Sequence, residues 1–121
     1  SNATRDLSDA LRRRCLYSYV DYPSPAKEAK IIARHIPLLN EKLLFQIVQM
    51  VDKIRQLNLR KRPGVAEAID WAGALMCLEI TDIKSLIEEG NENQLEHSLS
   101  CLLKTREDRR QVNVKQLASS L

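Results

Sequence analysis

The sequence predicts an all-α fold: a small helical bundle preceded by a short helix and one extended strand. From Ser24 onward, apolar residues recur at spacings of three and four, the period of helices with one buried face. Pro63-Gly64 and Gly90 divide that stretch into segments of helix length. The 121 residues are 44% hydrophobic and 29% charged, so one domain with a modest core is expected.

The first 22 residues have a different character from the rest. Ser1 to Ala3 look like a tag remnant, so the natural sequence is expected to begin near Thr4. Ser8 can cap a short helix that runs through Arg14. Residues 16–22 are aromatic and β-branched and end at a proline, which predicts a strand. A lone strand needs partners, so residues 4–22 are expected to be a piece of a larger structure.

The first three helices of the bundle have clear start signals and apolar stripes. Ser24 as N-cap and Pro25 at the first position predict a helix to about His35. A second helix is expected over residues 40–57 and a third, after Pro63-Gly64, over 65–78. The inward residues expected are Ala29, Ile32, Ala33 and Ile36 in the first, Leu44, Ile47, Val48, Val51 and Ile54 in the second, and Ile69, Ala72, Gly73 and Met76 in the third.

The remaining elements are shorter. Thr81 is expected to cap a fourth helix that Gly90 ends, and Leu95, Leu99, Leu102 and Leu103 mark a fifth. Helix is also expected in the polar tail, residues 105–121. Bundle residues 23–121 therefore form one predicted domain.

Composition narrows the functional classes. No apolar run approaches 18 residues, which argues against a membrane span or a secretory signal. Three widely spaced cysteines without a CxxC pair are typical of reduced thiols, so a cytoplasmic location is expected. A net charge of +3 argues against a nucleic-acid partner, although residues 53–62 hold five basic and no acidic side chains.

Few residues offer catalytic chemistry. His97 and Cys101 lie four apart and could form half of a metal site, but no second half has suitable spacing, so no metal is expected. Trp71 is expected in the core rather than facing a partner. The chain has no phosphate-cradling glycine loop, so it is not expected to hold ATP by itself.

Two segments together carry a family resemblance. TRDLSDALRRRCLYSYVDYPSPAKEAKII, followed later by LRKRPGVAEAIDWAGAL, resembles the C-terminal part of AAA+ ATPases of the MoxR group, CoxD-like branch. The likeness covers roughly residues 4 to 103. It implies that residues 4–22 end the nucleotide-binding core and that 23–121 form its helical lid. The Walker A and B segments would then lie upstream.

The resemblance also implies roles for individual arginines. Arg14 matches the arginine finger that reaches the ATP site of the neighbouring subunit, and Arg13 is the alternative. A guanidinium supplied in trans neutralises charge on the transferring phosphoryl group. Many relatives carry a nucleotide-contacting sensor-2 arginine at the start of the third lid helix. Here Glu67 stands about there, and a carboxylate would repel phosphate; Arg62 is near enough to substitute.

The resemblance implies a parent that is an ATPase using ATP and Mg²⁺, while the fragment alone is inactive. Its partners would be neighbouring subunits of a homo-oligomeric ring, expected to be a hexamer, and a metalloenzyme or von Willebrand-type adaptor client that it remodels or helps to assemble. The residues themselves are compatible with two other functional classes. One is a stand-alone helical protein-interaction domain, and the other is a small nucleic-acid-binding bundle that uses residues 53–62.

Overall fold

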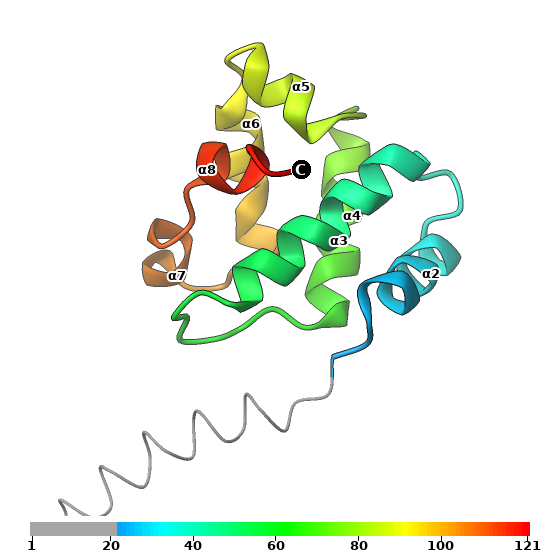
Figure 1. Cartoon of the computed structure of the whole chain (residues 1–121), viewed down its shortest axis with the longest axis horizontal. Coiled ribbons are helices and arrows are strands. Elements are labelled where there is room, and N and C mark those ends of the chain that lie inside the picture. Colours follow the sequence, from blue (N-terminus) through cyan, green and yellow to red (C-terminus); the bar gives the residue numbers. More distant parts are fainter. Residues whose placement is uncertain (1–21) are drawn as a thin grey trace, which may run out of the picture.

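A computed structural model describes residues 22–121, and every described element is helical (Figure 1). There is no strand among residues 22–121, so the all-α prediction is confirmed for this part of the chain. The elements are α2 (Pro25–His35), α3 (Glu41–Arg55), α4 (Val65–Cys77), α5 (Ile83–Glu88), α6 (Glu92–Ser98), the 3₁₀ turn η1 (Leu99–Cys101), α7 (Arg106–Arg110) and α8 (Val114–Ala118). The predicted tag remnant, the helix ending at Arg14 and residues 16–21 of the predicted strand lie outside the described residues.

Polar side chains start the first two helices where the sequence predicts. The Ser24 hydroxyl accepts a hydrogen bond from the Lys27 amide at 3.3 Å, and Pro25 follows at the first helical position. The Asn40 side chain accepts from the amides of Lys42 and Leu43 at 2.8 and 3.4 Å. Each cap satisfies amides that have no partner inside the helix, which fixes the two start points.

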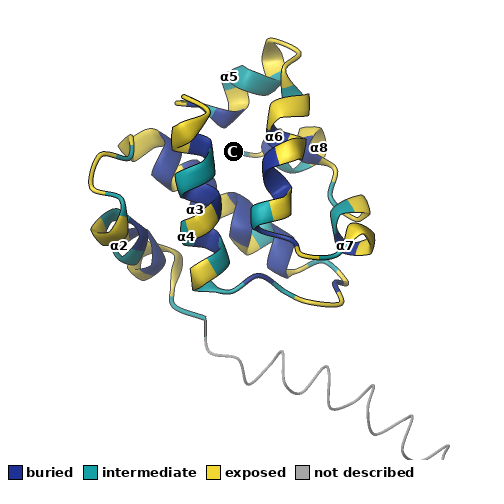
Figure 2. Ribbon diagram, turned by 180° about the vertical axis from the view of Figure 1, so that it is seen from behind, coloured by how far each residue is buried: buried dark blue, intermediate teal, exposed yellow. Residues whose placement is uncertain are grey.

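Helix α3 forms the centre of the bundle. It packs against α2, α4 and α8, with α2 on one side and α5 to α8 on the other (Figures 1 and 2). All five residues of its predicted stripe are buried. Trp71 of α4 is fully buried, as predicted for a core residue, and its indole nitrogen donates to the Ser98 hydroxyl at 2.8 Å. The four leucines predicted for the fifth helix are buried as well, over α6, η1 and the residues just beyond.

Two local predictions were wrong. Asp82, and not Thr81, caps α5, because its carboxylate accepts from the amides of Lys84 and Ser85 at 3.0 and 3.2 Å. Met76 lies near the end of α4 and is 39% exposed instead of buried. The predicted helix in the tail is present as two short helices, α7 and α8, and α8 buries Val114 against the core.

Candidate functional site

A buried arginine joins three elements at one end of the bundle. Arg55 is the last residue of α3, and its guanidinium pairs with Glu28 of α2. Its two terminal nitrogens donate to the two carboxylate oxygens at 2.8 and 2.7 Å. Its Nε donates to the carbonyl of Pro63, in the loop before α4, at 2.9 Å. Charged hydrogen bonds in this forked geometry are strong and directional, so the three elements are held in fixed relative positions.

An aromatic ring completes this cluster. The ring of Tyr22 lies over the Arg55 guanidinium, 4.1 Å from its carbon to the ring centroid. A cation over an aromatic face is attracted by the negative face of the ring. Tyr22 comes three residues before α2, so the chain that leads into the bundle makes contact with the end of α3. We call Tyr22, Glu28, Arg55 and Pro63 the Arg55 cluster.

The sequence analysis did not identify this cluster, although a signal was present. Glu28 stands four residues before the buried Ile32, and Arg55 stands four residues after the buried Val51. Both charged residues therefore occupy positions in the apolar register of their helices. Because a charge is rarely buried unless it is paired, two opposite charges in buried register predict one pair.

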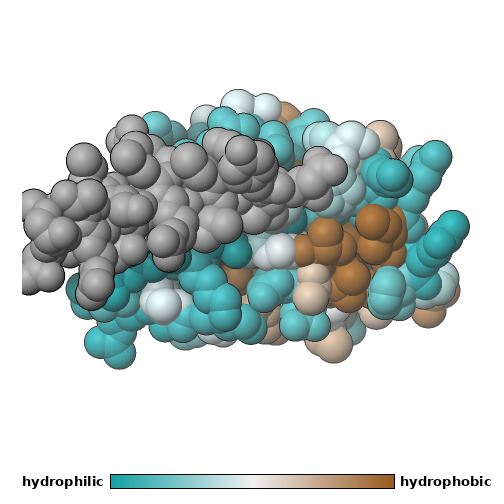
Figure 3. All heavy atoms as spheres, turned by 90° about the horizontal axis from the view of Figure 1, so that it is seen from below, coloured by the Kyte–Doolittle hydropathy of each residue, from teal (hydrophilic) through white to brown (hydrophobic). Residues whose placement is uncertain are grey.

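Segments that are far apart in the sequence line one hollow beside the cluster. Its lining residues come from the chain before α2, from α2 itself and from the start of α4: Tyr22, Pro23, Ser24, Lys27, Ile31 and Val65. Figure 3 shows a compact group of hydrophobic side chains on this lower face, toward the α2 side, with hydrophilic residues around it. The hollow is open to solvent and combines apolar walls with one lysine.

Both predicted sensor-2 residues, Arg62 and Glu67, make hydrogen bonds within the bundle. The Arg62 Nε donates to the carbonyl of Arg55 at 3.0 Å, and one terminal nitrogen donates to the carbonyl of Leu57 at 3.5 Å. The Glu67 carboxylate accepts from the Gly64 amide at 3.1 Å and so stabilises the start of α4. In this arrangement Arg62 holds its own loop and Glu67 caps a helix. The predicted finger Arg14 and its alternative Arg13 lie outside the described residues.

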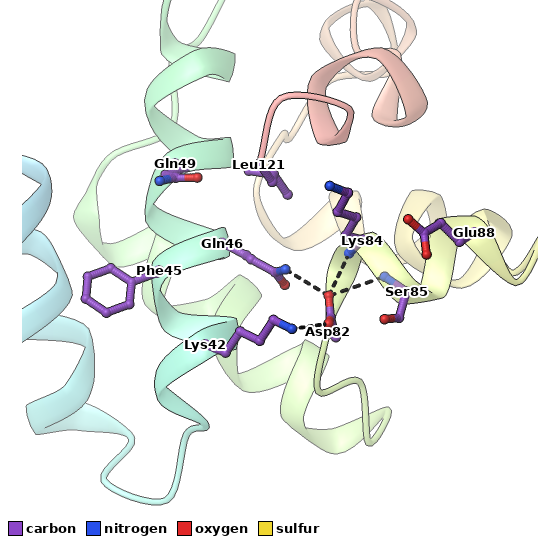
Figure 4. A pocket seen from close by; sticks show the side chains of 9 residues that line it. All are labelled: Lys42, Phe45, Gln46, Gln49, Asp82, Lys84, Ser85, Glu88 and Leu121. Atoms are coloured by element: carbon purple, nitrogen blue, oxygen red, sulfur yellow. Dashed lines mark hydrogen bonds and ion pairs between the residues drawn. The ribbon is translucent and has the colours of Figure 1, made fainter.

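A second polar network joins α3 to α5 (Figure 4). The Asp82 carboxylate accepts from the side-chain amide of Gln46 at 2.8 Å and pairs with the Lys42 ammonium at 2.9 Å. The Gln46 carbonyl oxygen accepts from the Ile83 amide. The hydrogen bond from Gln46, followed by that from Lys42, holds the pKa of Asp82 well below its usual range.

This second network gives no sign of catalysis. It lines an open hollow with Phe45, Gln49, Lys84, Ser85, Glu88 and Leu121. In Figure 4 the Phe45 ring points away from Asp82. Both oxygens of Asp82 accept hydrogen bonds within the bundle, and a carboxylate with so low a pKa is a poor proton carrier at neutral pH. We interpret the network as the structural cap of α5.

No three His, Cys, Asp or Glu side chains of residues 22–121 are grouped so that they could hold a metal ion, and His97 and Cys101 gain no further ligand there. None of the helices in the same range is long and apolar enough to cross a membrane.

Comparisons with protein-family models, with curated proteins and with solved structures give no match for this chain.

Proposed function

We propose that this chain is the end of the core and the helical lid of a ring-forming AAA+ ATPase of the MoxR group, CoxD-like branch. The parent would hydrolyse ATP with Mg²⁺ and would remodel or help to assemble a metalloenzyme partner. In the ring, Arg14 would act as the finger in trans, with Arg13 as the alternative.

The observation that supports this proposal most is the convergence of the two segments that carry the resemblance. Tyr22 and Glu28 belong to the first segment, and Pro63 belongs to the second. Arg55 binds all three, although it lies in neither segment. The hollow beside the cluster is likewise lined from both segments. Two segments far apart in the chain thus contribute to one face of the bundle, which supports a shared role for them.

The same face carries the start of α4, where the resemblance implies a sensor-2 contact with nucleotide, together with the start of α2. Lys27 supplies a positive charge at this hollow, and Val65 supplies an apolar wall. For Arg62 to reach a nucleotide, it would have to exchange its bonds to two backbone carbonyls for bonds to phosphate. Glu67, bound to the Gly64 amide, acts as a helix cap and not as a phosphate ligand.

The full-length parent tests the proposal. Its sequence should contain GxxxxGK[ST] about 100–150 residues before this chain, the phosphate loop of the core. Arg14→Ala should leave ATP binding nearly intact and lower turnover by ~10³-fold or more, because transition-state charge loses its partner. Arg14→Lys should recover little, since an ammonium lacks the planar fork.

Mixed rings give the sharper version of this test. An Arg14→Ala subunit keeps its own phosphate loop, and a Walker-dead subunit keeps its own finger. Mixing the two should restore some turnover. Normal turnover in rings of Arg14→Ala, and also of Arg13→Ala, would overturn the assignment.

A stand-alone protein-interaction domain is the second candidate, and one observation favours it. Leu38 and Phe45, two large apolar side chains, are 88% and 54% exposed. A parent without a phosphate loop, together with a partner lost on Phe45→Ala, would favour that function.

A further inference from the structure

The Arg55 guanidinium donates a hydrogen bond from each of its three nitrogens. Nε donates to the carbonyl of Pro63, and both terminal nitrogens donate to the Glu28 carboxylate. The guanidinium held in this way also lies over the Tyr22 ring, with 4.1 Å between its carbon and the ring centroid. The position of that ring is therefore set by α2, by α3 and by the loop before α4 at the same time.

Stability alone does not account well for such an arrangement. A buried ion pair loses its hydration, and apolar residues of similar volume often stabilise a fold equally well or better. What the paired fork supplies is a fixed orientation. Here the guanidinium held in that orientation contacts Tyr22, the residue at which the chain enters the bundle.

The connection between Tyr22 and α2 is short and stiff. The chain runs Tyr22-Pro23-Ser24-Pro25, so two of its four residues are prolines with a fixed φ. The residue before each proline is restricted to extended backbone, and Ser24 has a φ of −58° and a ψ of 155°. A displacement of the Tyr22 backbone would therefore be passed on to the start of α2 instead of being absorbed by the connection.

We propose that Tyr22, stacked on Arg55, is the positioning residue that couples the segment before it to the helical bundle. This inference rests on the proposed function, in which the core ends at Tyr22 and the lid begins at Pro23. Tyr22 transmits the position of the core to the starts of α2 and α4, which line the hollow beside the cluster. Tyr22 does not touch the reacting atoms. It acts through Arg55.

The contact itself is tested in this chain by nuclear magnetic resonance. A ring over the guanidinium shifts the resonance of the Arg55 Nε–H, so Tyr22→Ala should remove that shift and also move the amide signals at Gly64 and Val65. Tyr22→Phe keeps the ring and should preserve the shift. Phe45→Ala removes an exposed aromatic of α3 that belongs to the other hollow, so it serves as the matched control. An unchanged Arg55 signal in Tyr22→Ala would overturn the coupling.

The functional consequence is tested in the full-length parent. Tyr22→Ala should lower kcat by ~10-fold or more with little change in KM for ATP, because misplaced catalytic groups cost rate even when binding persists. Tyr22→Phe keeps the aromatic ring and should retain kcat. A loss confined to Tyr22→Ala would then be due to the missing ring. An active parent whose kcat is unaffected by Tyr22→Ala would overturn the coupling and leave the proposed function standing. A parent without ATPase activity would overturn both.

Discussion

Two polar networks tie α3 to its neighbours, and they differ mainly in their contact with water. In the Arg55 cluster, the side chains of Arg55 and Glu28 are 4% and 2% exposed. In the network around Asp82, the side chains of Lys42 and Asp82 are 69% and 19% exposed. Each network contains one ion pair at a similar short distance. Because water screens charges, the same pairing chemistry has different consequences at the two places.

The comparison shows what each network does for the fold. The Arg55 cluster fixes the relative orientation of three elements and the entering chain, and it fails if one charge is left without its partner. The Asp82 network relies on neutral and backbone groups: Gln46 bridges α3 to α5, and Lys42 adds a charge at the rim. We therefore expect the first to depend on its charges and the second on Gln46.

The largest effect is expected from Glu28→Leu. This change leaves the Arg55 guanidinium buried without a counter-charge and should lower the free energy of unfolding by about 3–5 kcal/mol. Urea unfolding measures it, and Glu88→Leu, at an exposed position of α5, is the control. The double variant Glu28→Leu/Arg55→Leu should recover much of the loss, because it removes both charges. A loss below about 1 kcal/mol for Glu28→Leu would contradict the difference drawn between the two networks.

A smaller effect is expected from Gln46→Leu. Gln46 is 8% exposed, and its side chain both accepts from the Ile83 amide and donates to Asp82. A buried amide left without a partner costs about 1–3 kcal/mol. Urea unfolding again measures the change. Gln49→Leu is the matched control, because Gln49 lines the same hollow but is exposed. Equal losses for the two variants would show that Gln46 is not the essential residue of the network.

Much of the fold could be predicted because single helices are local. The start of α2 follows from Ser24 and Pro25, and the stripe from Leu44 to Ile54 follows from helical spacing alone. Trp71 was also predicted to be buried, and it is. These features need no knowledge of where other helices lie.

The long-range contacts that were not predicted have a common physical cause. Asp82 caps α5 in place of the predicted Thr81. Its carboxylate also accepts a hydrogen bond from Gln46 and pairs with Lys42, and both of these residues lie on α3, about forty residues earlier in the chain. The Arg55 cluster likewise depends on four separate segments. Sequence spacing gives the face of a helix on which a residue lies, but the partner opposite that face is a property of the tertiary packing. The roles of Arg62 and Glu67 differ, because their partners are close in the sequence: the Glu67 carboxylate binds the amide of Gly64, three residues before it, and Arg62 binds the carbonyl of Arg55, seven residues before it.

Acid should weaken the Asp82 network, because it protonates the Asp82 carboxylate. Interactions with Gln46 and Lys42 lower the pKa of Asp82 in the folded chain. A group whose pKa is lowered by folding stabilises the fold above its unfolded pKa, about 3.9 for aspartate, and that stabilisation is lost as the pH falls below this value. Asp82→Asn should therefore flatten the fall of stability between about pH 4 and pH 2, measured by thermal melts. An unchanged acid limb in Asp82→Asn would contradict a lowered pKa.

The smallest effect is expected from Lys42→Met, although this change breaks a 2.9 Å ion pair. The Lys42 side chain is mostly in water, so the pair gains little over hydration, and salt screens what remains. The unfolding midpoint at physiological ionic strength should match that of the parent chain, with a slight decrease only at low salt. The hydrogen bond from Gln46 has the largest influence on the pKa of Asp82, so this pKa should rise in Lys42→Met yet stay below its usual value. Lys30→Met, at an exposed position of α2, controls for the loss of one positive charge. If Lys42→Met destabilised the chain as much as Gln46→Leu, the exposed ion pair would carry the α3–α5 contact, and the contrast with the buried Arg55 cluster would fail.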